Sequence, residues 1–233
     1  WSGRLALVAG HLAALGGAVA GIGVSLGVLL GEPGRTLTQP LPDLFPFARL
    51  SLAVDGLSAF FLLVISLVAI AAAIYGPAYL RAHAPDAGPA RQAAQVLALN
   101  VFLACMVFVC CAGDALTFLL CWEGMTLASY VLVVSDDRNG ENARAGLLYM
   151  VMAHGGTALL LVAFLTLTER AGAFDFAALR AAAGDLDSTT RMTLFFLALG
   201  GFGTKAGVIP LHVWLPRAHP AAPSHVSALM SGV

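Results

Sequence analysis

The chain has 233 residues, of which 59% are hydrophobic and only 11% are charged, and its formal net charge at pH 7 is −1. Soluble proteins carry about 25% charged residues, so this composition excludes a soluble globular domain. The net charge also excludes the basic surface that nucleic-acid binding needs, and we expect a lipid bilayer around this chain.

Six apolar runs are long enough to cross a bilayer as helices, which takes about 20 residues each. They cover residues 5–30, 54–80, 93–112, 114–134, 144–168 and 190–209. Barrel strands would be shorter and would alternate between polar and apolar residues. We therefore predict an all-α, polytopic transmembrane helix bundle in which residues 1–233 form a single membrane domain. The chain begins at Trp1, and a seventh apolar run starts just before Val233, so we expect a fragment whose next span is cut off.

Aspartates stand where three helices are expected to begin. Asp55 and Asp114 precede apolar runs, and we favour N-caps over membership of a proton relay for both. Asp175 precedes the sequence FAALRAAAG, which predicts a short surface helix ending at Gly184. The linker over residues 31–50 contains four prolines and cannot be helical.

One ionisable side chain stands in an apolar run where a charge is hardest to keep. Lys205, within TLFFLALGGFGTKAGVIP, is the single lysine, whereas the other eleven basic residues are arginines. Arginine stays protonated in proteins, but a desolvated lysine can lose its proton. We therefore predict that Lys205 handles protons.

Glu123 lies nine residues after Asp114, which places it ~14 Å along its helix, about half of the hydrocarbon thickness. Thr126 and Tyr130, at i+3 and i+7, extend a narrow polar stripe on one face. An ionisable group at this depth costs at least ~2.5–3.5 kcal/mol, which favours a functional role. We predict a Glu123–Lys205 pair that holds or releases a proton as the distance between the two side chains changes. A static interhelical ion pair, or a neutral hydrogen-bonded carboxylic acid, is the structural alternative.

Histidines supply the remaining titratable groups. His154 lies near mid-depth of its span, and His212, His219 and His225 follow Lys205. Histidine titrates near neutrality, so we predict relay roles for His154, His219 and His225, with hydrogen bonding between helices or helix capping as the alternative.

Prolines interrupt the chain after Lys205. Pro210 cannot donate to the helix ladder, and Pro216, Pro220 and Pro223 follow it, so we predict a helix broken at Pro210 and a broken segment over residues 210–225. Such a segment lines a cavity when it lies within the membrane. The alternative is an ordinary linker that leaves the membrane.

Motifs for other chemistry are missing from the sequence. It has no GxGxxG, Walker loop or Gly-x-Ser-x-Gly, and Cys105, Cys110, Cys111 and Cys121 contain no CxxC pair. We interpret the cysteines as small buried thiols. We expect no metal or cofactor in this chain, and we assign any redox chemistry to partner subunits.

Three segments carry a family resemblance. VDGLSAFFLLVISLV, GDALTFLLCWEGMTLASYVLVV and GGFGTKAGVIPLHVWLPRAHPAAPSHVSALMSGV, in this order, resemble the antiporter-like subunits of respiratory complex I, Mrp antiporters and group 4 membrane-bound hydrogenases. The complex I and Mrp members of that family typically have Pro-Thr-Pro-Val-Ser-Ala where this chain has residues 223–228, and a histidine at the position of Ser231. This departure, with MVMAHGGTA around His154, looks like the formate hydrogenlyase and hydrogenase-4 branch.

The resemblance implies a proton channel in which Glu123 tunes Lys205 and Lys205 carries the proton. It implies a further helix before Trp1, several after Val233 and a second, inverted half-channel. Because Ser231 replaces the usual connecting histidine, His219 or His225 is expected to substitute for it.

The function implied is a proton-translocating subunit of a hydrogenase-like or NADH:quinone oxidoreductase-like complex, multi-pass in the bacterial inner membrane. Its expected partners are other membrane subunits and peripheral redox subunits that hold iron–sulfur, NiFe or flavin centres. The alternatives are a Na⁺/H⁺ antiporter subunit and, in another class, a structural membrane anchor for redox subunits.

Overall fold

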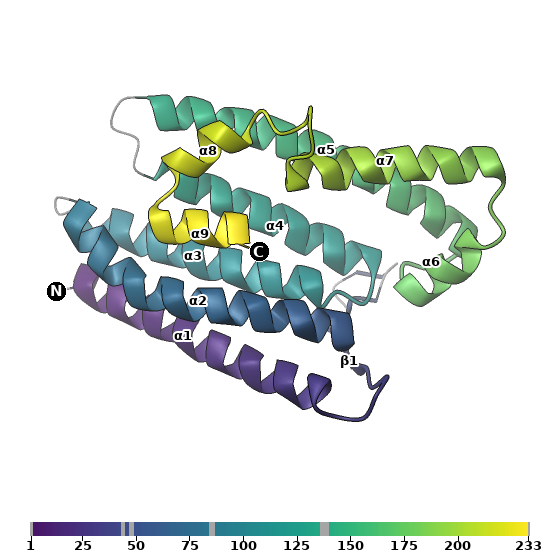
Figure 1. Cartoon of the computed structure of the whole chain (residues 1–233), viewed down its shortest axis with the longest axis horizontal. Helices are drawn as coiled ribbons and strands as arrows, with labels where there is room; N and C mark the ends of the chain where they lie inside the picture. The colour runs from purple at the N-terminus through teal and green to yellow at the C-terminus, as the bar shows by residue number, and fades with distance from the viewer. Residues whose placement is uncertain (1, 43–44, 47–48, 84–86, 136–139, 233) are drawn as a thin grey trace.

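The computed structural model describes residues 2–42, 45–46, 49–83, 87–135 and 140–232. This part of the chain is a bundle of long helices joined by short connections (Figure 1). The elements in chain order are α1 (Ser2–Leu29), β1 (Leu37–Pro40), β2 (Ser51–Val54), α2 (Gly56–His83), α3 (Pro89–Cys110), α4 (Ala115–Val134), α5 (Glu141–Ala171), α6 (Phe176–Ala183), α7 (Ser188–Ala206), α8 (Leu215–Ala221) and α9 (Ser224–Gly232).

Five of the described helices, α1 to α5, are long and apolar enough to cross a membrane, and their ends lie within a few residues of the first five predicted spans. The sixth predicted span forms α7, which is 19 residues long and is not among those five. Its polar first turn, Arg191 and Lys205 lower its hydropathy. The helix that carries Lys205 is thus less hydrophobic than the other five.

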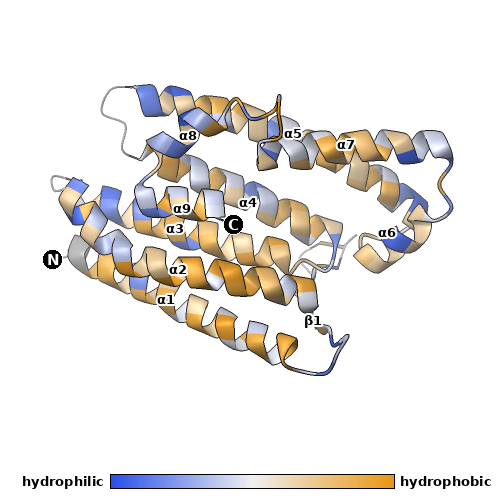
Figure 2. Ribbon diagram, viewed as in Figure 1, coloured by the Kyte–Doolittle hydropathy of each residue, from blue (hydrophilic) through white to orange (hydrophobic). Residues whose placement is uncertain are grey.

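Apolar side chains face outward as well as inward. Large residues such as Leu5, Ile74 and Leu97 are each about two-thirds exposed. Figure 2 shows apolar residues along most of the helix lengths, with hydrophilic residues gathered at helix ends and connections. Exposed apolar surface of this extent is unfavourable in water and matches a surface that contacts lipid.

Between α1 and α2 the contact is made largely by small residues. Ala14 and Ala18 on α1 and Ala69 and Ala72 on α2 are buried in the main core. Small side chains let helix backbones approach closely, and this close packing supplies the attraction that apolar burial cannot supply in lipid.

The predicted N-caps are confirmed. The Ser58 amide donates to Asp55 at 2.8 Å, and the Ala178 amide donates to Asp175 at 2.9 Å. Asp175 begins the short helix α6, which ends at Gly184 as predicted.

Asp114 has a wider structural role than a cap. Its Oδ1 accepts the Thr117 amide at 2.7 Å, and its Oδ2 accepts the Ser51 amide at 2.7 Å and the Ser51 hydroxyl at 3.0 Å. Ser51 begins β2, which pairs antiparallel with β1 in the proline-rich linker. The buried carboxylate therefore ties the hairpin to the start of α4.

The helix that carries Lys205 ends earlier than predicted and for a different reason. Gly207 has φ +70°, and the Val208 amide donates to the Gly203 carbonyl at 2.9 Å. This is the glycine-terminated C-cap, in which a left-handed residue turns the chain back onto the last helical turn. The break is therefore at Gly207, three residues before Pro210, where it was predicted from the sequence.

The segment after the break is also more regular than predicted. Residues 209–214 form turns, α8 begins at Leu215, and α9 begins at Ser224 within the range predicted to be broken. The Trp214 indole donates to the Thr204 carbonyl at 2.8 Å, which ties the turns back to α7. Figure 1 shows the segment folding back onto the bundle, where α8 packs on α5 and α9 packs on α2.

Candidate functional site

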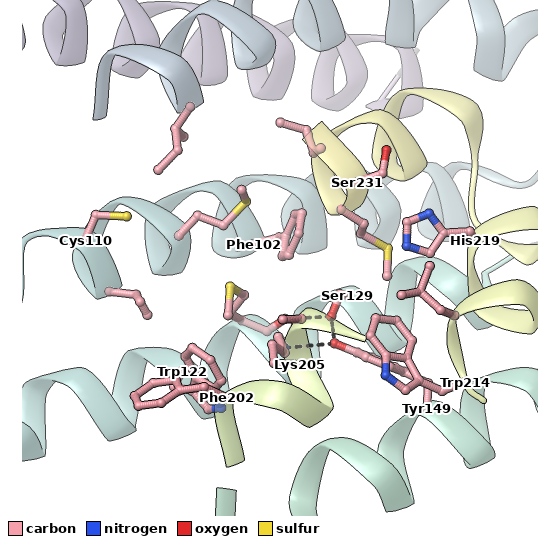
Figure 3. Close-up of a pocket in the computed structure, with 18 residues that line it drawn as sticks. Phe102, Cys110, Trp122, Ser129, Tyr149, Phe202, Lys205, Trp214, His219 and Ser231 are labelled. Atoms are coloured by element: carbon pink, nitrogen blue, oxygen red, sulfur yellow. Dashed lines mark hydrogen bonds between the residues drawn. The ribbon is translucent and has the colours of Figure 1, made fainter. Parts of the chain in front are cut away.

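A cavity of about 610 Å³ lies between the described helices beside Lys205 (Figure 3). Its walls come from α2, α3, α4, α5, α7, α8 and α9, so segments from most of the chain meet here. Most lining side chains are apolar or aromatic. The polar ones are Ser129, Lys205, His219 and Ser231, with the hydroxyl of Tyr149 and the indole nitrogens of Trp122 and Trp214.

The ammonium of Lys205 is held by two hydroxyl groups. Its Nζ donates to Thr126 Oγ1 at 2.9 Å and to Tyr149 OH at 3.1 Å. Tyr149 OH is in turn 2.7 Å from Ser129 Oγ, so a chain of hydroxyls leads from the amine to α4 (Figure 3). Thr126 and Tyr149 are fully buried.

Aromatic rings give the amine its remaining neighbours. Nζ lies 5.4 Å from the ring centroid of Trp122 and 5.5 Å from that of Tyr149. A cation within about 6 Å of a ring is attracted by the ring quadrupole, and this attraction is larger where water is excluded. The rings therefore stabilise positive charge without a carboxylate.

Glycines set the distance between α5 and α7. A Cβ added to Gly201 would lie 2.5 Å from Leu160 and 2.9 Å from the Gly156 carbonyl. A Cβ on Gly156 would in turn lie 3.1 Å from the Gly201 carbonyl. Because both positions lack a side chain, α7 lies close enough to α5 for Lys205 to reach Tyr149.

The predicted Glu123–Lys205 pair is not formed. Glu123 Oε2 lies 3.2 Å from His154 Nε2, and within the described residues no ion pair joins Glu123 to Lys205. Thr126, one turn further along α4, takes the place that was predicted for the glutamate. The reason is the rotation of α4, which directs Thr126 toward α7 and Glu123 toward α5.

The Glu123–His154 contact holds one exchangeable proton. His154 Nδ1 lies 3.0 Å from the Met150 carbonyl, and a carbonyl only accepts, so Nδ1 carries a hydrogen. The proton between Nε2 and Oε2 then makes either an imidazolium and carboxylate or an imidazole and carboxylic acid. The His154 side chain is 48% exposed and that of Glu123 is 29% exposed, so the pair lies at the outer face of the bundle.

The later histidines separate into two places. His219 lines the Lys205 cavity, as does Ser231, and His219 Nδ1 is 3.5 Å from the Ser227 hydroxyl. His225 does not line this cavity; it is buried beside Tyr79 of α2, with ring centroids 5.5 Å apart. Of the two residues expected to replace the histidine missing at Ser231, only His219 shares its cavity.

Sequence reasoning missed three site residues, namely Trp122, Ser129 and Tyr149. Ser129 lies one turn after Thr126, so the polar stripe of α4 contained a signal for it. Tyr130, which was assigned to that stripe, instead packs beside Gly146. Tyr149 had no such signal, because a tyrosine in an apolar helix is common at bilayer interfaces.

Among the residues that the structure describes, no group of three or more His, Cys, Asp or Glu side chains could hold a metal ion. The four cysteines are free thiols. Burial raises the pKa of the Cys111 thiol to about 11, so it stays protonated at neutral pH.

The fold and the site define a polytopic helical membrane protein with a lysine amine that lines a cavity between its helices. Residues 112–233 match the family described as NADH:quinone oxidoreductase/Mrp antiporter, TM, and the chain belongs to this family. It is 41% identical over 231 residues to hydrogenase-4 component B of Escherichia coli K12, covering 99% of this chain and 33% of the relative. The chain thus spans about a third of the length of the curated relatives it matches.

Two solved structures have the same fold. One is the membrane-bound sulfane sulfur reductase, an archaeal respiratory membrane complex, with a TM-score of 0.79 at 20% identity over 98% of this chain and 47% of that chain. The other is the Mrp complex from Dietzia sp. DQ12-45-1b, with a TM-score of 0.79 at 24% identity over 97% of this chain and 41% of that chain.

Proposed function

We propose that this chain is part of a proton-translocating membrane subunit, in which Lys205 binds and releases the proton. The observation that carries the proposal is the contact of Lys205 Nζ with Thr126 and Tyr149. The Thr126 hydroxyl donates its own hydrogen to the Trp122 carbonyl at 3.1 Å, so it accepts from Nζ. Both an ammonium and a neutral amine carry N–H groups that can donate to a hydroxyl. The site therefore accommodates both protonation states, whereas a carboxylate in contact with the amine would favour the ammonium.

The cavity gives the amine a place to exchange its proton. The cavity is large enough for several waters, and its polar lining groups, Ser129, Lys205, His219 and Ser231, offer them hydrogen-bond partners. Such waters can pass a proton between Lys205 and His219. The Glu123–His154 pair, which joins α4 to α5, is a second proton-binding unit, and its Glu123 lies on the helix that also carries Thr126. A proton added to this pair changes the charge near Lys205 without contacting it, and this electrostatic effect replaces the direct pair predicted from sequence.

We further propose that the protein works in the bacterial inner membrane, within a complex of other membrane subunits and peripheral redox subunits. The match to hydrogenase-4 component B supports this assignment. Electron transfer would take place at iron–sulfur, NiFe or flavin centres of the redox subunits, and this chain would supply proton movement.

Replacing Lys205 by Met tests the proposal in the whole assembled complex, reconstituted in vesicles with a pH-sensitive dye. We expect assembly to persist and redox-driven proton uptake to be lost. Lys205→Arg is the matched control, because it keeps the charge but cannot release a proton, and it should also lose uptake. Full proton uptake by the assembled Lys205→Met complex would contradict the proposed proton channel and would favour the structural membrane anchor.

The Na⁺/H⁺ antiporter alternative is separated by ion dependence. The same vesicles are assayed with and without sodium at equal ionic strength. Proton movement that needs sodium on the opposite side would favour the antiporter, whereas sodium-independent movement supports the proposed proton channel.

A further inference from the structure

Two buried histidines from distant parts of the chain meet outside the Lys205 cavity. His11 on α1 is 4% exposed and His225 on α9 is 5% exposed. Both rings lie against Gly76 of α2, where an added Cβ would stand 2.6 Å from His11 Nε2 and 3.5 Å from His225 Cδ2. The missing side chain of Gly76 is therefore what makes room for the two rings to converge.

Each ring leaves one buried nitrogen without a hydrogen-bond partner among the described residues, namely His11 Nε2 and His225 Nδ1. His11 Nδ1 is 2.8 Å from the Leu7 carbonyl, so it carries the hydrogen, and Nε2 of the neutral ring has a free lone pair. Buried polar atoms nearly always have a hydrogen-bond partner, and a bound water is one partner that these two nitrogens can share.

We propose that His11 and His225 bind one water between them and form a second proton-binding station at the junction of α1, α2 and α9. The water donates one hydrogen to His11 Nε2, and its other hydrogen or its oxygen bonds to His225 Nδ1. An arriving proton binds one ring and gives an imidazolium. That imidazolium passes a proton through the water to the other ring, which becomes the imidazolium as the first ring returns to its neutral form, and the proton leaves the pair when the imidazolium gives it up. Only N–H and O–H bonds form and break, and no electrons move.

The surroundings of the pair are nearly free of charge. On α2, the Tyr79 ring meets His225 edge-on, and the His83 ring stacks on Tyr79 with centroids 4.1 Å apart. On α3, the side chains that meet α1 next to His11 are the uncharged Val96 and Asn100.

No carboxylate of the described residues forms an ion pair with either histidine. On α8, which packs on α9, His219 is titratable and faces the Lys205 cavity. No neighbouring negative charge therefore stabilises the imidazolium, so the pair can bind a proton and release it again.

The pair adjoins the proposed proton route. Leu229 lies one turn after His225 on α9, is fully buried and lines the Lys205 cavity. One helical turn of about 5.4 Å thus separates the cavity wall from the histidine pair. The inference rests on the proposed proton-conducting function, which it extends by a route along α9.

Non-titrating polar substitutions test the pair. His11→Gln and His225→Asn place an amide near the atom that binds water but cannot carry the proton. We expect each to lower redox-driven proton uptake by the assembled complex about tenfold or more, with unchanged assembly. His83→Gln, which changes an exposed histidine of α2, is the matched control and should retain uptake. Unchanged uptake in both His11→Gln and His225→Asn overturns the relay.

A second measurement does not depend on transport. In ¹⁵N-histidine NMR of the full protein in lipid, His225→Asn should shift the His11 Nε2 resonance, and His83→Gln should not. An unshifted His11 resonance overturns the shared water. Lys205→Met should abolish uptake yet leave this coupling intact. If proton uptake by the wild-type complex does not depend on Lys205, the proposed function and the relay both fail. A shift of the His11 Nε2 resonance in His225→Asn would in that case still support the shared water.

Discussion

Lys205 and Thr126 are joined across the bundle by a 2.9 Å hydrogen bond from the ammonium to a neutral hydroxyl. Glu123 lies one turn away on the same helix and pairs with His154 instead. The carboxylate is thus kept out of contact with the amine that it was predicted to pair with. A direct ion pair would hold the proton firmly, whereas hydroxyl partners serve both states of the amine. This arrangement leads to separate predictions for the two halves of the site.

Thr126→Val removes an acceptor from Lys205 while keeping the shape of the side chain. The lost hydrogen bond to a charged group should cost about 1.5–3 kcal/mol in the protonated state. We expect proton uptake by the complex to fall, with a smaller fall for Thr126→Ser, which keeps the hydroxyl. Equal uptake by the Val and Ser variants would show that the hydroxyl has no part in proton transfer.

Glu123 and His154 should act as one unit. Glu123→Gln and His154→Gln are each expected to reduce proton uptake, and the double variant should be little worse than either single change. Uptake is measured for all four proteins of this double-mutant cycle. Losses that simply multiply would mean that the two residues act independently despite their 3.2 Å contact.

Gly201→Ala should force α7 away from α5. The added methyl would stand 2.5 Å from Leu160 and 2.9 Å from the Gly156 carbonyl, and overpacking of this kind costs about 1–3 kcal/mol. We expect a lower thermal unfolding midpoint in detergent and reduced proton uptake, because Lys205 moves with α7.

Gly155→Ala on the facing helix is the matched control, because nothing lies within 4 Å of its added methyl. It should leave stability unchanged or raise it by up to about 1 kcal/mol through helix propensity. Equal midpoints for the two variants would show that the close approach of α5 and α7 is not needed.

Asp55 gives the fold a pH dependence outside the membrane spans. Its hydrogen bond from the Ser58 amide holds the carboxyl pKa below the ordinary value of 3.8. Because the folded-state pKa is the lower one, this stabilisation is complete above the ordinary pKa and disappears as the pH falls through the folded-state value.

Asp55→Asn keeps a capping oxygen but cannot titrate, so its thermal midpoint should fall less steeply in acid than that of the wild type. Asp55→Ala should lower the midpoint near neutral pH as well, because it removes the cap. Identical acid profiles for wild type and Asp55→Asn would contradict this role.

Much of the fold was determined by local sequence. Long apolar runs specify spanning helices because, within lipid, every backbone N–H and C=O group must form its hydrogen bond inside the protein. Asp55, Asp114 and Asp175 specify helix starts because a short acidic side chain reaches the free amides of the first turn. The isolation of Lys205 among apolar residues likewise marked the site without any knowledge of its neighbours.

The tertiary structure alone decided which groups touch. Glu123 and Thr126 differ by one helical turn, so the sequence could not distinguish which of them faces Lys205. That choice depends on the rotation of α4, and on the approach of α5 and α7 at Gly156 and Gly201. The meeting of His11 with His225 is equally invisible in sequence, because it depends on where α9 returns to the bundle after the break at Gly207.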